Sequence, residues 1–332
     1  MAVTIPGGVP PAHSERSGIS EPIIWAQHLT KIFGSETAVQ DVTFEVPRGA
    51  IFGFVGPSGS GKTTTIRLLT GIYPLSSGEA KVLGWTPTHF SQNTRAKIGY
   101  MPQHFVLYPN LSVWENLNFA ASIYGMGLRR GGRLREVLDF VELGEHRNKL
   151  AGKISGGMQR RLSLAATLVH DPILIFLDEP TAGIDPVLRR KFWEHFRDLQ
   201  SEGRTLFVTT QYVSEAAYCD LVAVMAEGRL LVVDTPEGLR HRAFGGDVVD
   251  LRTKERADFQ IIQNLRELPF VRHVLRGEAD NALRLVVDEA RTAVPDLVEW
   301  LPQHSCALES IEEYVPPFDD VFVEIVKQKG TA

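Results

Sequence analysis

The chain has 332 residues, 43% of them hydrophobic and 23% charged, which is ordinary for a soluble globular protein with one large domain and a smaller one. Its net charge of −5 gives no bulk attraction to nucleic acid, so we expect no nucleic-acid partner. No apolar run has the length of a membrane span, so a protein working at a membrane would need a partner that crosses it.

The first part of the chain predicts a tail, strands and a loop. Residues 1–22 are rich in proline, glycine and serine and are predicted to form a disordered tail. The apolar stretch 23–25 and the alternation of apolar and polar residues over 42–46 predict antiparallel strands. A short apolar run at 51–55 predicts a strand that leads into a glycine-rich loop and then into a helix beginning at Lys62.

The glycine-rich loop, residues 56–63, fits the pattern G-x-x-x-x-G-K-[ST]. Its glycines let the backbone curl so that successive N–H groups point inward, and the helix that follows directs its positive N-terminal end at the same anion. We expect Lys62 to reach the outer phosphates of a nucleotide and the hydroxyl of Thr63 to bind Mg²⁺. The residues predicted to bind the phosphates are Gly56, Ser58, Gly59, Ser60, Gly61, Lys62, Thr63 and Thr64.

The middle of the chain alternates between strand-like and helical patterns. After a short strand expected at 80–84, apolar residues recur at helical spacing between 111 and 150, and a further helix is predicted to begin at Ser155. Two apolar runs, 172–177 and 205–209, predict buried strands. Strands that alternate with helices around a phosphate loop favour an α/β fold, with a mostly parallel sheet wrapped by helices.

Beyond about residue 245 the pattern restarts on a smaller scale. We expect residues 242–246 to be a linker and residues 247–332 to be a small α+β domain. Its predicted strands are 248–252, 271–276, 283–288 and 306–314, and its predicted helices are 259–267, 294–301 and 319–327. The two cysteines, Cys219 and Cys306, have no metal-ligand spacing and are expected to be reduced thiols.

Two acidic residues, Asp178 and Glu179, directly follow the apolar run 172–177. Ligands bind at the C-terminal ends of the strands in an open parallel sheet. Asp178 is therefore well placed to hold Mg²⁺ through water, and Glu179 could accept a proton from an attacking water.

A second anion site is predicted at Ser155, Gly156 and Gly157, where a serine cap and two bare backbone amides begin a helix. An ordinary capped helix would have the same pattern. Two phosphate-facing helix ends in one chain suggest that two chains share a nucleotide.

Together these motifs resemble the nucleotide-binding subunit of an ATP-binding cassette (ABC) transporter. Residues 154–158 resemble the LSGGQ signature of that family, residues 100–103 its Q-loop, and the stretch that ends at Asp185 its D-loop. The resemblance implies that Gln103 contacts Mg²⁺ and the lytic water, and that Phe33 stacks on adenine.

The resemblance also implies an architecture. It predicts a P-loop NTPase core, the ABC ATPase domain, over residues 23–241, with an antiparallel β subdomain and a helical subdomain at about 105–165, followed by the small α+β domain. ATP and Mg²⁺ are the implied cofactors. The implied catalytic residues are Glu179, Gln103 and Gln211.

Two positions depart from the family's pattern. Gln211 stands where the switch histidine is expected, and Met158 replaces the glutamine of the signature. Glutamine can hydrogen-bond a γ-phosphate but does not ionise, so basal hydrolysis is expected to be slow.

The stretches 181–186, 209–212 and 317–322 resemble the antibiotic-resistance (daunorubicin-type) ATPases of ABC-2 exporters. This resemblance implies a separate ABC-2 membrane permease as partner and a place at the cytoplasmic face of the cell membrane. It also implies an ATP-dependent homodimer or a pair with a paralogous ATPase. The run 104–108 could line the groove for the permease's coupling helix, and the alternative that it is simply core is equally favoured.

An exporter ATPase, in which two copies enclose two ATP molecules, is the leading hypothesis, with import as a minor variant. Soluble ABC ATPases of translation or DNA repair carry tandem cassettes or long coiled-coil inserts, which this sequence lacks. A regulatory ATP-binding protein with slow hydrolysis is the other alternative, and Gln211 is the residue that suggests it.

Overall fold

The computed structural model describes residues 21–104, 106–277 and 279–330. The disordered tail expected at residues 1–22 lies outside these ranges except for its last two residues. Within the described ranges, no helix combines the length and the apolar character that crossing a membrane requires.

The centre of the molecule is a six-stranded sheet in the order β5-β6-β7-β3-β8-β9, parallel throughout except for β9, which pairs antiparallel with β8. The strands β3, β6 and β7 are buried along their whole length, because both faces of the sheet are covered. The predicted mostly parallel sheet is therefore confirmed. Its strands are β3 (Ile51–Val55), β5 (Ile98–Met101), β6 (Leu174–Asp178), β7 (Thr205–Thr210), β8 (Leu221–Ala226) and β9 (Arg229–Asp234).

A separate antiparallel sheet, in the order β2-β1-β4, packs against one face of the central sheet. Phe44 from this sheet contacts the rings of Phe52, Phe54 and Phe207 from the central one, with centroids 5.6–6.0 Å apart. These aromatic contacts fasten the antiparallel β subdomain to the strands that carry the phosphate loop. Its strands are β1 (Ile24–Phe33), β2 (Glu36–Val46) and β4 (Ser77–Val82).

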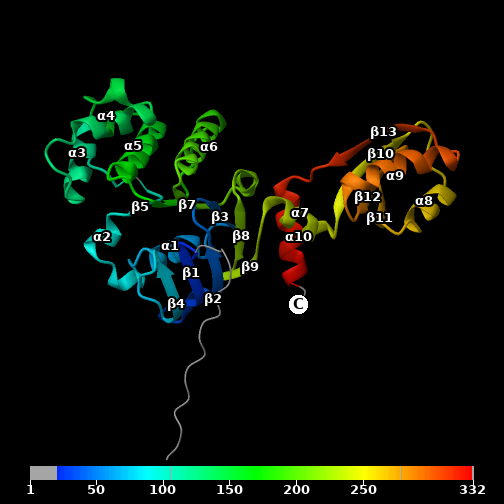
Figure 1. Ribbon diagram of the computed structural model, residues 1–332, viewed down its shortest axis with the longest axis horizontal. Helices are drawn as coiled ribbons and strands as arrows, with labels where there is room; N and C mark the ends of the chain where they lie inside the picture. Colours follow the sequence, from blue (N-terminus) through cyan, green and yellow to red (C-terminus); the bar gives the residue numbers. More distant parts are fainter. Residues whose placement is uncertain (1–20, 105, 278, 331–332) are drawn as a thin grey trace, which may run out of the picture.

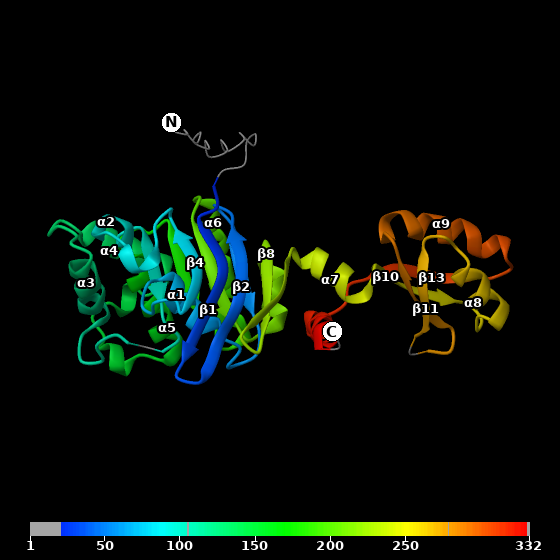
Figure 2. The ribbon, with the colours of Figure 1, turned by 90° about the horizontal axis from the view of Figure 1, so that it is seen from below.

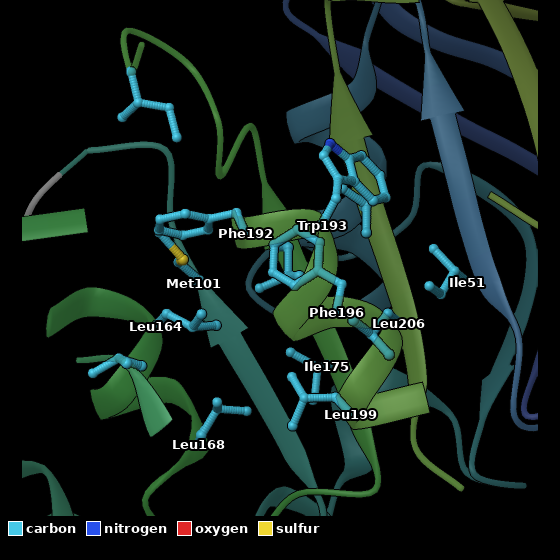
Figure 3. Packing of buried hydrophobic residues seen from close by; sticks show 14 of the residues in the cluster. Ile51, Met101, Leu164, Leu168, Ile175, Phe192, Trp193, Phe196, Leu199 and Leu206 are labelled. Carbon is cyan, nitrogen blue, oxygen red and sulfur yellow. The ribbon is translucent and has the colours of Figure 1, made fainter. Parts of the chain in front are cut away.

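Helices cover the other face and form the helical subdomain (Figure 1). Figure 3 shows Phe192 of α6 beside Met101 of β5, and Trp193 and Phe196 of α6 and Leu164 of α5 belong to the same core. The helices of the ATPase part are α1 (Lys62–Leu69), α2 (Gln92–Arg95), α3 (Val113–Ile123), α4 (Gly131–Phe140), α5 (Gly156–Leu168), α6 (Pro186–Ser201) and α7 (Pro236–Phe244), with short 3-10 turns η1 (Pro87–His89), η2 (Gly144–His146), η3 (Ala151–Lys153) and η4 (Val213–Tyr218).

The small domain follows the order strand, helix, strand, strand, helix, strand, and its antiparallel sheet has the order β11-β12-β10-β13. This arrangement is the split βαβ, or ferredoxin-like, topology. Apolar side chains from both helices and all its strands form a core of their own, and the domain stands apart from the ATPase lobe in Figure 2. Its elements are β10 (Asp247–Thr253), α8 (Phe259–Arg266), β11 (Val271–Arg276), β12 (Ala282–Val287), α9 (Ala290–Gln303) and β13 (Leu308–Tyr314).

The last helix, α10 (Phe318–Gly330), differs from the expectation that placed it in the small domain. It packs against α7 and η4, and its residues Phe318, Val321 and Ile325 are buried in the main core of the ATPase part. The expected linker also differs, because α7 continues to Phe244 and ends at a left-handed Gly245. The chain thus leaves the ATPase lobe once, builds the small domain and returns.

The docking of α10 predicts a stability effect on the ATPase core. Ile325 is 4% exposed and Val323 on the same helix is 47% exposed. Replacing Ile325 by alanine should lower the free energy of unfolding by about 2–4 kcal/mol, because it leaves a cavity in the core, whereas Val323→Ala should change it by less than about 0.5 kcal/mol. Denaturant unfolding followed by tryptophan fluorescence measures both. Equal, small effects would contradict this packing.

Candidate nucleotide-binding site

The phosphate loop between β3 and α1 has a backbone that only glycine adopts easily. Gly59 and Gly61 have φ angles of 80° and 102°. A Cβ atom on Gly56 would lie 2.1 Å from the carbonyl oxygen of Met225, so β8 approaches this glycine too closely for any side chain. Among the described residues, no side chain caps the N-terminus of α1. The backbone N–H groups of its first turn therefore remain available to an anion.

Lys62 is buried beneath this loop. Its ammonium donates hydrogen bonds of 2.8 Å to the carbonyl oxygens of Gly56 and Pro57 and lies 3.5 Å from Oε1 of Glu179. Burial lowers the pKa of Lys62, and the negative charge of Glu179 opposes that shift. The loop thus holds a cation against the carboxylate of Glu179 at the end of β6, two strands away in the sheet.

Asp178 is organised by two threonine hydroxyls. Its Oδ1 accepts hydrogen bonds from Thr63 at 3.0 Å and from Thr209 at 2.8 Å, while its buried Oδ2 has no hydrogen-bond partner among the described residues. An unpartnered buried carboxylate oxygen beside a threonine hydroxyl is a hard oxygen donor set, the kind that Mg²⁺ prefers. The residues present therefore fit a magnesium ion.

Glu179 follows at the end of β6 with a φ of 47°, a left-handed backbone that is uncommon outside glycine and is often stored at functional sites. Its N–H donates to both the carbonyl and the hydroxyl oxygen of Thr209, at 3.1 and 3.0 Å. Its Oε2 accepts a hydrogen bond of 2.8 Å from the side-chain amide of Gln103. Backbone and side chain of Glu179 are thus both held in place.

These groups open into a cavity of about 610 Å³. Phe33 lies in its wall and is 42% exposed, as a side chain that stacks on a planar ring needs to be. The first residues of β2 and the turn between β8 and β9 complete the wall, a contribution that no sequence motif indicates. The lining residues are Phe33, Glu36, Thr37, Ala38, Ser58, Gly59, Gly61, Lys62, Thr63, Thr64, Gln103, Glu179, Glu227 and Gly228.

The signature residues lie elsewhere in the same chain. Ser155 caps α5 by accepting a hydrogen bond of 3.3 Å from the backbone N–H of Met158. Ser155, Gly157 and Asp185 line a second depression. Among the described residues, none lines both this depression and the Lys62 cavity. Asp185 caps α6 by accepting from the N–H groups of the two residues after Pro186.

Gln211 is exposed directly after β7, and in the part of the chain that the structure describes it does not line the cavity. The structure therefore brings together the phosphate loop, Asp178, Glu179, Gln103 and Phe33. It does not bring Gln211 or the signature residues to them.

Sequence motifs do not indicate two further residues of this site. Thr209 is fully buried and links both acidic residues through its hydroxyl. Arg160 on α5 lies within the field of Asp178 and Glu179, which partly offset the lowering of its pKa by burial. Its Nη1 is buried without a hydrogen-bond partner in the described part of the chain. The signal for Thr209 was its place one residue before the end of a buried strand.

A phosphate loop, a buried Asp–Glu pair and parallel strands that end at one edge define a P-loop nucleotide-binding protein. Within that class, residues 39–182 match the ABC transporter family. The probable multidrug ABC transporter ATP-binding protein YbhF of Escherichia coli is 38% identical over 256 residues, which cover 76% of this chain and 44% of YbhF. The chain thus spans less than half the length of that relative.

Two other relatives are matched over nearly their whole length. The linearmycin resistance ATP-binding protein LnrL of Bacillus subtilis is 31% identical, with 91% of this chain and 98% of LnrL covered. The daunorubicin resistance ATP-binding protein DrrA2 of Streptomyces coeruleorubidus is 33% identical, with 90% and 94% covered. The chain belongs to the ABC transporter family, which confirms the predicted family and enzyme class, and both of these relatives are named as drug-resistance ATP-binding proteins.

Among solved structures, a dimeric ATP-binding cassette in a post-hydrolysis state, bound to ADP and Pi, superposes with a TM-score of 0.60 at 25% identity. The match covers 98% of that cassette and 64% of this chain. It confirms the predicted fold of the ATPase part.

From the contacts of the Thr209 hydroxyl we predict that its removal slows ATP hydrolysis. Thr209→Val removes the hydrogen bond that the hydroxyl donates to Asp178 and the one that it accepts from the N–H of Glu179, and it keeps the shape and the backbone contact. The kcat for ATP hydrolysis should therefore fall by roughly ten- to a hundredfold, with little change in ATP affinity. Thr205→Val in the same strand is the matched control, because among the described residues its hydroxyl accepts a hydrogen bond from Gly49 N–H alone, away from the acidic pair. Steady-state kinetics and equilibrium binding distinguish the two. Equal kcat values in both variants would show that Thr209 does not order the acidic pair.

Proposed function

We propose that this chain is the ATP-hydrolysing subunit of an ABC-2 type exporter and powers a separate membrane permease. The observation that carries the proposal is the separation of two phosphate-facing helix ends. Lys62 and its cavity form one half of an ATP site, and the Ser155 end of α5 lies in another depression of the same chain. Each half is incomplete alone, which favours two copies arranged so that each supplies the half that the other needs.

In this arrangement each ATP lies between the Lys62 loop of one copy and Ser155, Gly156 and Gly157 of the other. The partner is a second copy of this chain or a paralogous ATPase. The dimeric cassette that shares this fold supports the arrangement. Asp185, at the edge of the signature depression, lies where two copies would meet.

The proposed reaction assigns roles to six residues in or beside the cavity. Thr63, Asp178 and Gln103 would hold Mg²⁺, which neutralises charge on the phosphates when bound. Lys62 binds the outer phosphates, and Phe33 stacks on adenine. Glu179, held by Gln103 and Thr209, accepts the proton of the attacking water.

The partner surface is proposed on the helical subdomain. Exposed apolar side chains gather on α3 and the segments beside it, and Tyr108 and Phe119 meet edge-on at 5.0 Å. The exposed members are Val106, Tyr108, Phe119, Ile123 and Leu128. Of the run 104–108, Leu107 packs into the core, Val106 and Tyr108 are exposed, and Phe105 lies outside the described residues. A permease helix that covers this strip would hold the chain at the cytoplasmic face of the cell membrane.

The test of the exporter proposal is a pull-down of tagged Glu179→Gln protein from detergent-solubilised membranes in the presence of ATP. Without its general base the protein should remain in the ATP-bound dimer and retain a stoichiometric, multi-spanning membrane protein, identified by mass spectrometry. The same variant with ADP is the control and should retain much less dimer. Recovery from the soluble fraction alone, without a membrane partner, would refute coupling to a permease.

A regulatory protein with slow hydrolysis is the second candidate, favoured by the exposed, non-ionising Gln211. Under the exporter proposal glutamine is a competent switch, so Gln211→His should change kcat by less than about threefold. The measurement is steady-state ATP turnover of both proteins at matched stability. A gain of tenfold or more would favour the regulatory function.

A further inference from the structure

The segment that follows Gln211 is attached to α6, the helix that begins at the D-loop. Arg189 lies one turn into α6, and its backbone N–H donates to the carbonyl oxygen of Asp185 at 2.9 Å. The guanidinium of Arg189 lies 4.1 Å from the ring centroid of Tyr212, and its Nε lies 3.5 Å from Oε1 of Glu215. We call Arg189, Tyr212 and Glu215 the switch clamp.

The ion pair in the switch clamp is poorly compensated. Glu215 is 1% exposed, and neither of its carboxylate oxygens has a hydrogen-bond partner among the described residues. Nε of Arg189 is likewise buried without one. A buried carboxylate that faces a cation at 3.5 Å recovers only part of its desolvation cost, and well-packed apolar residues are often at least as stable in such places. Stability of the fold therefore does not account for this pair.

Other contacts fix the far end of the same turn to the same helix. The rings of Trp193 and Tyr218 stack with centroids 5.1 Å apart, and Arg197 donates to the carbonyl oxygen of Tyr218 at 3.3 Å. On its other side, the N–H of Tyr212 donates to the hydroxyl of Thr210 at the end of β7. Gln211 is thus an exposed residue in a segment whose two ends are both held in place.

We propose that Arg189 and Glu215 are positioning residues for ATP hydrolysis, joining the switch glutamine to the D-loop helix. Gln211 and Asp185 then move as one unit when two copies close on ATP. Nε of Arg189 and Oε1 of Glu215 are 3.5 Å apart and would form a hydrogen bond at about 3.0 Å. Because this bond would give both buried atoms the partner that they lack, we expect the clamp to tighten when two copies close on ATP. The inference rests on the proposed role of Gln211 at the γ-phosphate.

The first test is the steady-state kinetics of the full chain with ATP and Mg²⁺. Glu215→Gln removes the charge and keeps the size, so kcat should fall about tenfold with KM for ATP within about twofold, because the Lys62 loop is untouched. Arg189→Lys keeps the charge but loses the planar stack on Tyr212, and it should lower kcat about threefold. Arg190→Gln, an exposed neighbour on α6, is the matched control and should leave kcat unchanged.

The second test asks whether the clamp acts through Gln211. The double variant Gln211→Ala with Glu215→Gln should turn over no more slowly than Gln211→Ala alone, because both remove the same interaction. If the double variant loses kcat by the product of the two single losses, the proposal is wrong. It is also wrong if Glu215→Gln or Arg189→Lys lowers the melting temperature but keeps the wild-type kcat. Wild-type turnover in Gln211→Ala would refute the role of Gln211 and the clamp with it. A loss in Gln211→Ala but not in Glu215→Gln would refute the clamp alone.

Discussion

The structure depends on the burial of charges where β3, β6 and β7 end together. Lys62, Asp178 and Glu179 are 3%, 1% and 6% exposed, so none is stabilised by bulk water. Each would be costly alone. The ammonium of Lys62 offsets the carboxylates, and the hydroxyls of Thr63 and Thr209 occupy one oxygen of Asp178. The unpartnered oxygen of Asp178 and the uncapped N-terminal end of α1 are the two features that the proposed Mg²⁺–nucleotide would satisfy.

Rigid surroundings keep these charged groups at fixed distances from one another. On one face of the sheet the stacked phenylalanine rings bind the antiparallel subdomain to β3 and β7. On the other face α6 presents Phe192, Trp193 and Phe196 to the core that β6 and α5 share (Figure 3). Close approaches complete the fit, since a Cβ on Gly53 would meet the sulfur of Cys219 at 2.6 Å. The buried charges are therefore surrounded by side chains with little freedom to relax.

Local patterns in the sequence predicted most of the strands, the phosphate loop and the acidic pair, because each depends on neighbouring residues. Strand β5 was not predicted, because four residues that include Gly99 give too short a pattern. The docking of α10 was missed because an amphipathic helix shows one apolar face whichever core receives it. The roles of Thr209 and Glu215 depend on contacts with residues distant in the sequence. The exposure of Gln211 follows from the course of the backbone after β7, which its residue type does not reveal.

The two attachments of α6 differ in strength. Towards the signature helix, Glu142 accepts from Lys191 of α6 at 2.8 Å and from Arg161 of α5 at 3.1 Å, and the hydrogen bond from Lys191 lowers the pKa of Glu142. Glu142 and Lys191 are nearly half exposed, so these pairs are screened and contribute about 0–1 kcal/mol each.

Towards the switch segment, α6 is joined by stacked rings and a buried ion pair, contacts that solvent screens little. Among the polar contacts of α6, those with the switch segment are therefore the stronger and the exposed pairs with α5 the weaker. α6 is thus held both by the apolar core that it shares with α5 and by the switch segment, and in the proposed dimer the exposed pairs between α6 and α5 are the contacts that would rearrange most easily.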